Sequence, residues 1–201
     1  APAPLPLLLS AAMLALATAS KYPFGLVAGL TILPFLVHHT RARPGLRLAY
    51  ALVGLAVFVA ADPYLWVHPV DRLWNSVTYH FGYAVNDHVR KAGLPWWQPL
   101  AWLTQAKPAE WHPGVFPLAF QDRLILVAAV LSAPAALARR PVLVAWAAVG
   151  LVFLLVWPTK WPQYTVMLRP ALAMCAGLGL TALLAAVTGR RRPASRGDLQ
   201  G

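Results

Sequence analysis

The sequence predicts an all-α integral membrane protein: a polytopic bundle of about six helices with a long outer segment that contains an amphipathic interfacial helix. Three observations predict this fold class. Of the 201 residues, 59% are hydrophobic and only 11% are charged, whereas a soluble domain carries about 25% charged residues. Long apolar stretches recur along the chain, and the basic residues gather in short clusters between them. Lipid is therefore expected to cover most of the surface.

The apolar stretches are the expected membrane spans. Several are shorter than the roughly 20 residues that cross a bilayer unaided, but arginines at their ends can reach the interface and neighbouring helices can bury short spans. The first stretch ends in Ala17-Thr18-Ala19, which resembles a signal-peptidase site. Because no basic residue precedes it, we expect a span rather than a signal peptide. The stretches are 5–19, 22–37, 46–61, 123–138, 141–157 and 165–187.

The distribution of charge predicts the orientation in a cell membrane. Nine of the 17 lysines and arginines lie in three clusters, at 41–47, 139–140 and 190–196, as the positive-inside rule requires of cytoplasmic loops. No basic stripe studded with aromatic residues favours nucleic acid as a partner, despite the net charge of +11. The predicted organisation is three spans in 1–61, an extracytoplasmic Trp-rich segment in 62–122, three spans in 123–187 and a basic cytoplasmic tail in 188–201.

The segment 62–122 carries the predicted interfacial helix, which runs to about Lys91. Apolar residues recur there at steps of three and four, which places them on one face of a helix, and polar residues populate most of the rest. Such a helix lies along a membrane surface. The apolar positions are Val70, Leu73, Val77, Phe81 and Val85.

Tryptophans, histidines and carboxylates in the same segment are candidate sugar or acceptor contacts. Tryptophan gathers at membrane interfaces and also stacks on flat apolar faces such as sugar rings, so the composition leaves both roles open. The histidines lack the compact spacing of a zinc site, so we expect no metal site and no cofactor. A divalent ion held by carboxylates has no support in the sequence. The candidates are Trp66, His68, Asp71, His80, Trp111 and His112.

The loop that precedes the last apolar stretch carries candidate anion ligands. Lys160 and Arg169 supply two cations, and Gln163 and Tyr164 lie between them in the sequence. A charged side chain within a membrane span usually faces a cavity or a partner, which favours a functional role for Arg169. Together these four residues would suit the phosphate of a lipid.

Three stretches resemble the polyprenyl-phosphate-dependent membrane glycosyltransferases of the GT-C superfamily, in the branch of the protein O-mannosyltransferases and aminoarabinose transferases (glycosyltransferase family 39-like). The first is Ser20-Lys21-Tyr22 at the opening of a span. The second is Asp62-Pro63-Tyr64-Leu65-Trp66-Val67-His68-Pro69, followed by Tyr79-His80. The third is Lys160-Trp161-Pro162-Gln163-Tyr164 before a final span with Pro and Gly.

The resemblance implies transfer of a sugar from a polyprenyl-phosphate donor to an acceptor at the outer membrane face. It also implies that this chain corresponds to the C-terminal portion of the family, without the N-terminal loop that carries the catalytic Asp. No catalytic residue is therefore assigned, and Asp62 is not given that role. Lys160, Gln163 and Tyr164 match the last outer loop, where contacts to the donor phosphate are expected.

Two other classes of function stay open. A non-catalytic membrane subunit or scaffold could bind a partner through the outer segment. A small transporter is disfavoured, because transporters tend to contain internal repeats and none is found here. The sugar, the acceptor, the lipid carrier and the oligomeric state are not specified by the sequence.

Overall fold

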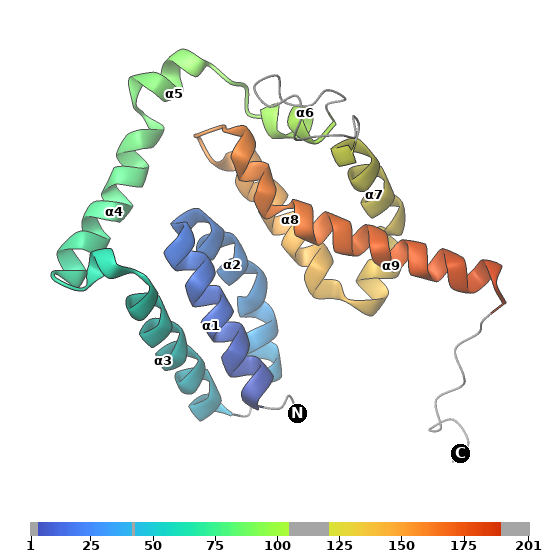
Figure 1. Cartoon of the computed structure of the whole chain (residues 1–201), viewed down its shortest axis with the longest axis horizontal. Helices are drawn as coiled ribbons and strands as arrows, with labels where there is room; N and C mark the ends of the chain where they lie inside the picture. Colours follow the sequence, from blue (N-terminus) through green and yellow to red (C-terminus); the bar gives the residue numbers. More distant parts are fainter. Residues whose placement is uncertain (1–3, 42, 105–120, 190–201) are drawn as a thin grey trace. The chain divides into compact units, whose positions relative to one another are not determined.

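A computed structural model describes residues 4–41, 43–104 and 121–189, apart from the side chain of Phe81, and all regular structure in these ranges is helical (Figure 1). Contacts divide the chain into two compact units. Unit 1 comprises Ala1–Leu103 and Ala145–Leu168, and unit 2 comprises Thr104–Val144 and Arg169–Gly201. Helix α8 (Pro141–Val156) crosses the boundary between them in sequence.

Unit 1 is built around the first three helices: α1 (Pro4–Ser20), α2 (Tyr22–His39) and α3 (Pro44–Ala61). Helix α1 packs against both α2 and α3. The approach of α1 to α2 depends on Gly25, because a Cβ atom there would lie 2.2 Å from the hydroxyl oxygen of Thr18. The sharp junctions between the helices follow from prolines in the first turns, where the missing N–H would have no partner in any case.

The rest of unit 1 consists of short elements and one longer helix. Their bounds are η1 Pro63–Leu65, α4 Pro69–Ala84, α5 Asp87–Ala92, α6 Gln98–Thr104 (whose last residue is assigned to unit 2) and η2 Pro162–Met167. Gly150 in α8 lies against Leu168, since a Cβ atom at Gly150 would be 2.5 Å from the leucine Cδ2. This contact fastens the end of η2 to α8.

Unit 2 is a pair of packed helices, α7 (Gln121–Arg139) and α9 (Arg169–Val187). They approach closely at Gly179, where a Cβ atom would lie 1.7 Å from Ser132 Oγ and 3.2 Å from Ser132 Cα. At the C-terminal end of α7, Arg139 Nη1 donates to the carbonyl oxygen of Leu178, the neighbour of Gly179 on α9, at 3.4 Å. Small residues at a helix contact allow this kind of close backbone approach.

Four of the helices in the described ranges are long and apolar enough to cross a membrane: α2, α3, α7 and α9. In the most apolar stretch of each, only 6% to 17% of the residues are buried, and many leucines and valines on these helices are exposed. Exposing so much apolar surface to water would be unfavourable. Long apolar helices with exposed leucines and valines are therefore typical of a membrane protein. The other two predicted spans are the apolar helices α1 and α8, of 17 and 16 residues.

Two predicted boundaries are wrong. The single helix expected to run to about Lys91 is two helices, because the Asn86 side chain accepts from His88 N and caps a new helix, α5. The last span, expected from residue 165, is α-helical only from Arg169, and a 3-10 helix precedes it. Pro170 explains this start, because proline is tolerated in the first turn of an α-helix but not farther inside.

Candidate functional site

A polar cluster lies where α1 meets α2 in unit 1. Lys21 separates the two helices in an extended conformation (φ −165°, ψ 114°), and Tyr22 begins α2. The Tyr22 hydroxyl donates to Asp62 Oδ2 at 2.9 Å. Asp62 follows the last residue of α3, and its Oδ1 accepts from the backbone N–H of Tyr64 at 3.2 Å. Both carboxylate oxygens of Asp62 therefore have partners, one of them 40 residues away in sequence.

Helix α4 adds His80 to this cluster. The rings of Tyr22 and His80 have centroids 5.8 Å apart. His80 Nδ1 lies 2.7 Å from the carbonyl oxygen of Ser76, which requires that Nδ1 carry the proton and leaves Nε2 outside this hydrogen bond. His80 is thus one of the residues predicted from the sequence that the structure brings to the α1–α2 junction.

The 3-10 helix η2 contributes an aromatic ring to the same end of unit 1. Lys21 Nζ lies 4.3 Å from the ring centroid of the buried Tyr164 and 5.6 Å from that of Phe24, within the range of a cation–π interaction. No carboxylate in the described ranges pairs with Lys21. Burial lowers the pKa of the Lys21 ammonium and raises the pKa of the Tyr164 phenol. Lys21 is thus a partly desolvated cation without an acidic partner among the residues that the structure describes.

Lys160, the first residue of the predicted anion loop, has a different environment. Its side chain is only 7% exposed, and Nζ donates to Leu154 O at 2.7 Å, to Leu155 O at 2.9 Å and to Trp157 O. An ammonium has three N–H donors, so all of them are used by carbonyls at the C-terminal end of α8. Burial also lowers the pKa of Lys160.

A small hollow beside Lys160 has a volume of about 10 Å³, which is room for about one water molecule. A phosphate group does not fit there without rearrangement of the loop. The hollow is lined by Val89, Ala92, Leu94, Pro158, Lys160 and Trp161.

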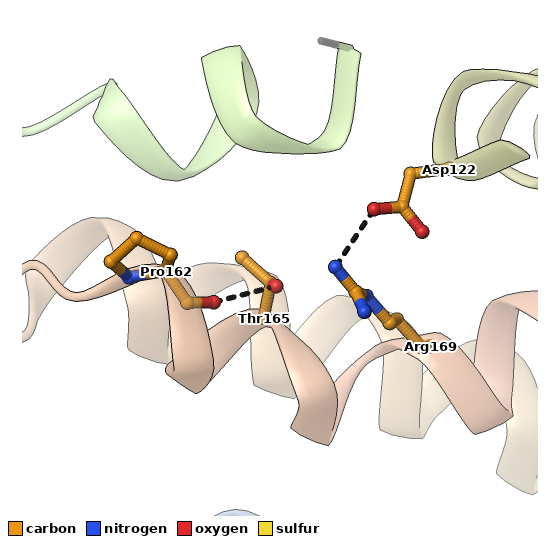
Figure 2. Close-up of polar contacts among 4 residues, drawn as sticks. All are labelled: Asp122, Pro162, Thr165 and Arg169. Carbon is orange, nitrogen blue, oxygen red and sulfur yellow. Dashed lines mark hydrogen bonds and ion pairs between the residues drawn. The ribbon is translucent and has the colours of Figure 1, made fainter. Parts of the chain in front are cut away.

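Arg169, the other predicted cation, lies in unit 2. Its Nη2 forms an ion pair with Asp122 Oδ2 at 2.8 Å, with side chains that are 41% and 27% exposed (Figure 2). The pair joins the first turns of α9 and α7. Figure 2 also shows Thr165 of unit 1, whose hydroxyl donates to the carbonyl oxygen of Pro162 at 2.8 Å within η2.

The remaining predicted site residues are exposed where they are described. Gln163, Trp66, His68 and Asp71 all lie at the surface, and Trp66 Nε1 donates to Val59 O at 2.7 Å. Trp111 and His112 lie outside the described residues. Within the described ranges, no three His, Cys, Asp or Glu side chains lie together in a group that could hold a metal ion.

Helix α4 turns its polar side toward the rest of unit 1. The less exposed side chains recur at steps of three and four residues: Arg72, Ser76, His80 and Tyr83. The predicted apolar face points elsewhere, with Val70 78% and Leu73 40% exposed, and Trp74 is exposed as well. The described residues of unit 1 therefore leave Val70, Leu73 and Trp74 exposed.

Lys21, Tyr22 and Asp62 are not among the site residues predicted from the sequence, although all three lie in stretches that carry the family resemblance. One signal could have drawn attention to Lys21: it is the only lysine or arginine that precedes Arg41. Comparison of the chain with models of protein families, with curated proteins and with solved structures found no match.

Proposed function

We propose that this chain is the C-terminal part of an integral membrane glycosyltransferase that moves a sugar from a polyprenyl-phosphate donor to an acceptor at the extracytoplasmic face. One observation supports this proposal above the others. The three stretches that carry the resemblance are far apart in sequence, yet their residues meet at one end of unit 1: Tyr22 contacts Asp62 and His80, and Lys21 contacts Tyr164. Residues that act together on a substrate must be close in space.

The chemistry of the cluster suits the departure of a lipid phosphate. Direct displacement at the anomeric carbon requires a base that activates the acceptor hydroxyl and cations that stabilise the leaving phosphate. In our proposal Lys21 supplies the cation, because it has no carboxylate partner in the described chain and is already partly desolvated. The exposed Gln163 and the buried Tyr164 complete the donor contacts. The base is assigned to no residue of this chain.

The two cations predicted from sequence have narrower roles in this proposal. Lys160 holds the loop by its three carbonyl bonds and so positions η2 and Tyr164. Arg169 is paired with Asp122 and stays a candidate phosphate ligand on sequence grounds. The exposed Trp66, His68 and Asp71 stay candidates for the sugar or the acceptor.

The proposed membrane arrangement has six spans, with α1 and α8 added to the four longer apolar helices. Helix α4 then lies along the membrane surface as an interfacial helix. The support is its exposed apolar face, which includes Val70, Leu73 and Trp74. Lipid headgroups and the adjoining acyl chains are the surroundings that such a face requires.

The test is sugar transfer by the protein in its natural full length, with a polyprenyl-phosphate sugar and membranes. We expect Lys21→Gln to weaken use of the donor at least tenfold, and Lys21→Arg to keep most of it, because the lost interaction is one with a single phosphate charge. Lys91→Gln, an exposed lysine on α5, is the matched control. Transfer that is unchanged in Lys21→Gln would remove Lys21 from the proposal, and absence of any transfer by the intact protein would remove the proposal itself.

A second candidate function is a non-catalytic membrane subunit that binds a protein partner. The exposed tryptophans Trp66, Trp74 and Trp96 favour it, because exposed aromatic side chains often anchor interfaces. Under this alternative, replacing these tryptophans with alanine abolishes co-purification of a partner, whereas Lys21→Gln has no effect on it.

A further inference from the structure

The turn between α2 and α3 carries a dense basic patch, which we call the basic turn and define as His38, His39, Arg41, Arg43 and Arg47. The first four of these side chains are exposed. The chain contains no Asp or Glu before Asp62, which lies at the other end of α3. The positive charge of the basic turn is therefore not neutralised by any acid on α1, α2 or α3.

Arg47 forms hydrogen bonds with Thr40 and Arg41 at the end of α2. Its Nε donates to Thr40 O at 3.3 Å and to Thr40 Oγ1 at 3.2 Å, and its Nη2 donates to Thr40 O at 3.1 Å and to Arg41 O at 2.9 Å. Thr40 itself is fully buried. These bonds occupy Nε and Nη2 and leave the two N–H donors of Nη1 without an acceptor in the described chain. The Nε and Nη2 edge of the guanidinium group is thus bonded to the end of α2, and Nη1 can donate to a ligand.

The location of the basic turn relative to the membrane determines which ligands it can bind. Helices α2 and α3 are both long and apolar enough to cross a membrane, so the turn that joins them emerges at the depth of the lipid headgroups. Exposed apolar side chains adjoin it on both helices: Leu33 and Val37 on α2, and Leu48 on α3. An amphiphile with a negative head and apolar tails matches a cationic turn flanked by apolar surface.

We propose that the basic turn binds the phosphate headgroup of an anionic phospholipid, with the acyl chains along the adjoining surfaces of α2 and α3. Guanidinium groups match phosphate oxygens in geometry and charge. This inference rests on the membrane spans and not on the proposed glycosyltransferase activity, so either can fail without the other. A free inorganic anion would share the phosphate chemistry but not the apolar contacts.

The test measures lipid selectivity of the full chain in nanodiscs that contain spin-labelled phosphatidylglycerol or phosphatidylcholine. A basic residue near an anionic surface contributes roughly a fivefold preference, so we expect Arg41→Gln/Arg43→Gln to reduce the preference for phosphatidylglycerol about tenfold or more. Arg41→Lys/Arg43→Lys should retain most of the preference. The matched control is Arg90→Gln/Lys91→Gln, which removes the same charge from exposed positions on α5.

Three outcomes would overturn the proposal. The first is unchanged selectivity in Arg41→Gln/Arg43→Gln, and the second is an equal loss in the control, since net charge alone would then account for the preference. The third is binding of inorganic phosphate by the chain in detergent with the same dependence on Arg41 and Arg43, together with no lipid preference in nanodiscs. A folded variant is confirmed by an unchanged elution volume, which is expected because the Arg41 and Arg43 side chains are exposed.

Discussion

At the scale of single residues, Lys21 gives the candidate site a dependence on pH. Burial lowers the pKa of its ammonium from the ordinary 10.5, so its charge is present below the lowered pKa and is lost as the pH rises through it. Transfer at low donor concentration should therefore decline at a pH below 10.5. Lys21→Arg should move this decline to higher pH, because a guanidinium stays protonated. Rates measured across alkaline pH test this, and identical profiles for the two proteins would contradict it.

Lys160 is the residue for which sequence and structure give different expectations. Its three carbonyl bonds at the end of α8 indicate that Lys160→Met should lower the free energy of unfolding by about 2 kcal/mol, a typical contribution of hydrogen bonds from a charged group. Unfolding in mixed detergent measures this, with the exposed Lys91→Met as control. If Lys160 instead bound the donor, stability would be unchanged and only donor affinity would fall.

At the scale of elements, the contact between α7 and α9 depends on one glycine. A Cβ atom at Gly179 would lie 1.7 Å from Ser132 Oγ, whereas one at Gly177 would meet nothing within 4 Å. Gly179→Ala should therefore destabilise the helix pair by about 1–3 kcal/mol, the usual cost of overpacking. Gly177→Ala should stabilise by up to about 1 kcal/mol, because alanine is the better helix former. The two midpoints of unfolding test this, and equal values would contradict the observed packing.

The sequence predicted the helical elements well and their ends less well. All the apolar stretches are helices, because a run of apolar residues of this length has few other ways to satisfy its backbone in lipid. The division of α4 from α5 was missed, although Asn86-Asp87 is a good start for a helix. The apolar periodicity continues through Val85 and concealed the break, because periodicity records which face is apolar and not where the chain changes direction.

At the scale of the whole molecule, the candidate site depends on contacts between distant residues, which a single sequence does not specify. Tyr22 and Asp62 are 40 residues apart, and Tyr164 is more distant still from Lys21. Hydropathy predicts which segments lie in lipid, but it does not state which helices are neighbours. The pairing of Tyr22 with Asp62 depends on the packing of α1 against α2 and α3, and that of Lys21 with Tyr164 depends on the position of η2. Local sequence pattern gives no information about either.

For the whole molecule, we also expect the basic turn and the candidate site to lie on opposite sides of the membrane. Helix α3 has 18 residues and is therefore about 27 Å long, close to the roughly 30 Å hydrocarbon thickness of a bilayer. In a chain whose Cys175 is replaced by Ser, single cysteines at Arg41 and at the exposed His68 should react with a membrane-impermeant maleimide from opposite sides of sealed vesicles. By the positive-inside rule, the cysteine at Arg41 should react only when the cytoplasmic side is open. Reaction of both cysteines from one side would show that α3 does not cross the bilayer, and the basic turn and the polar cluster would then share one membrane surface.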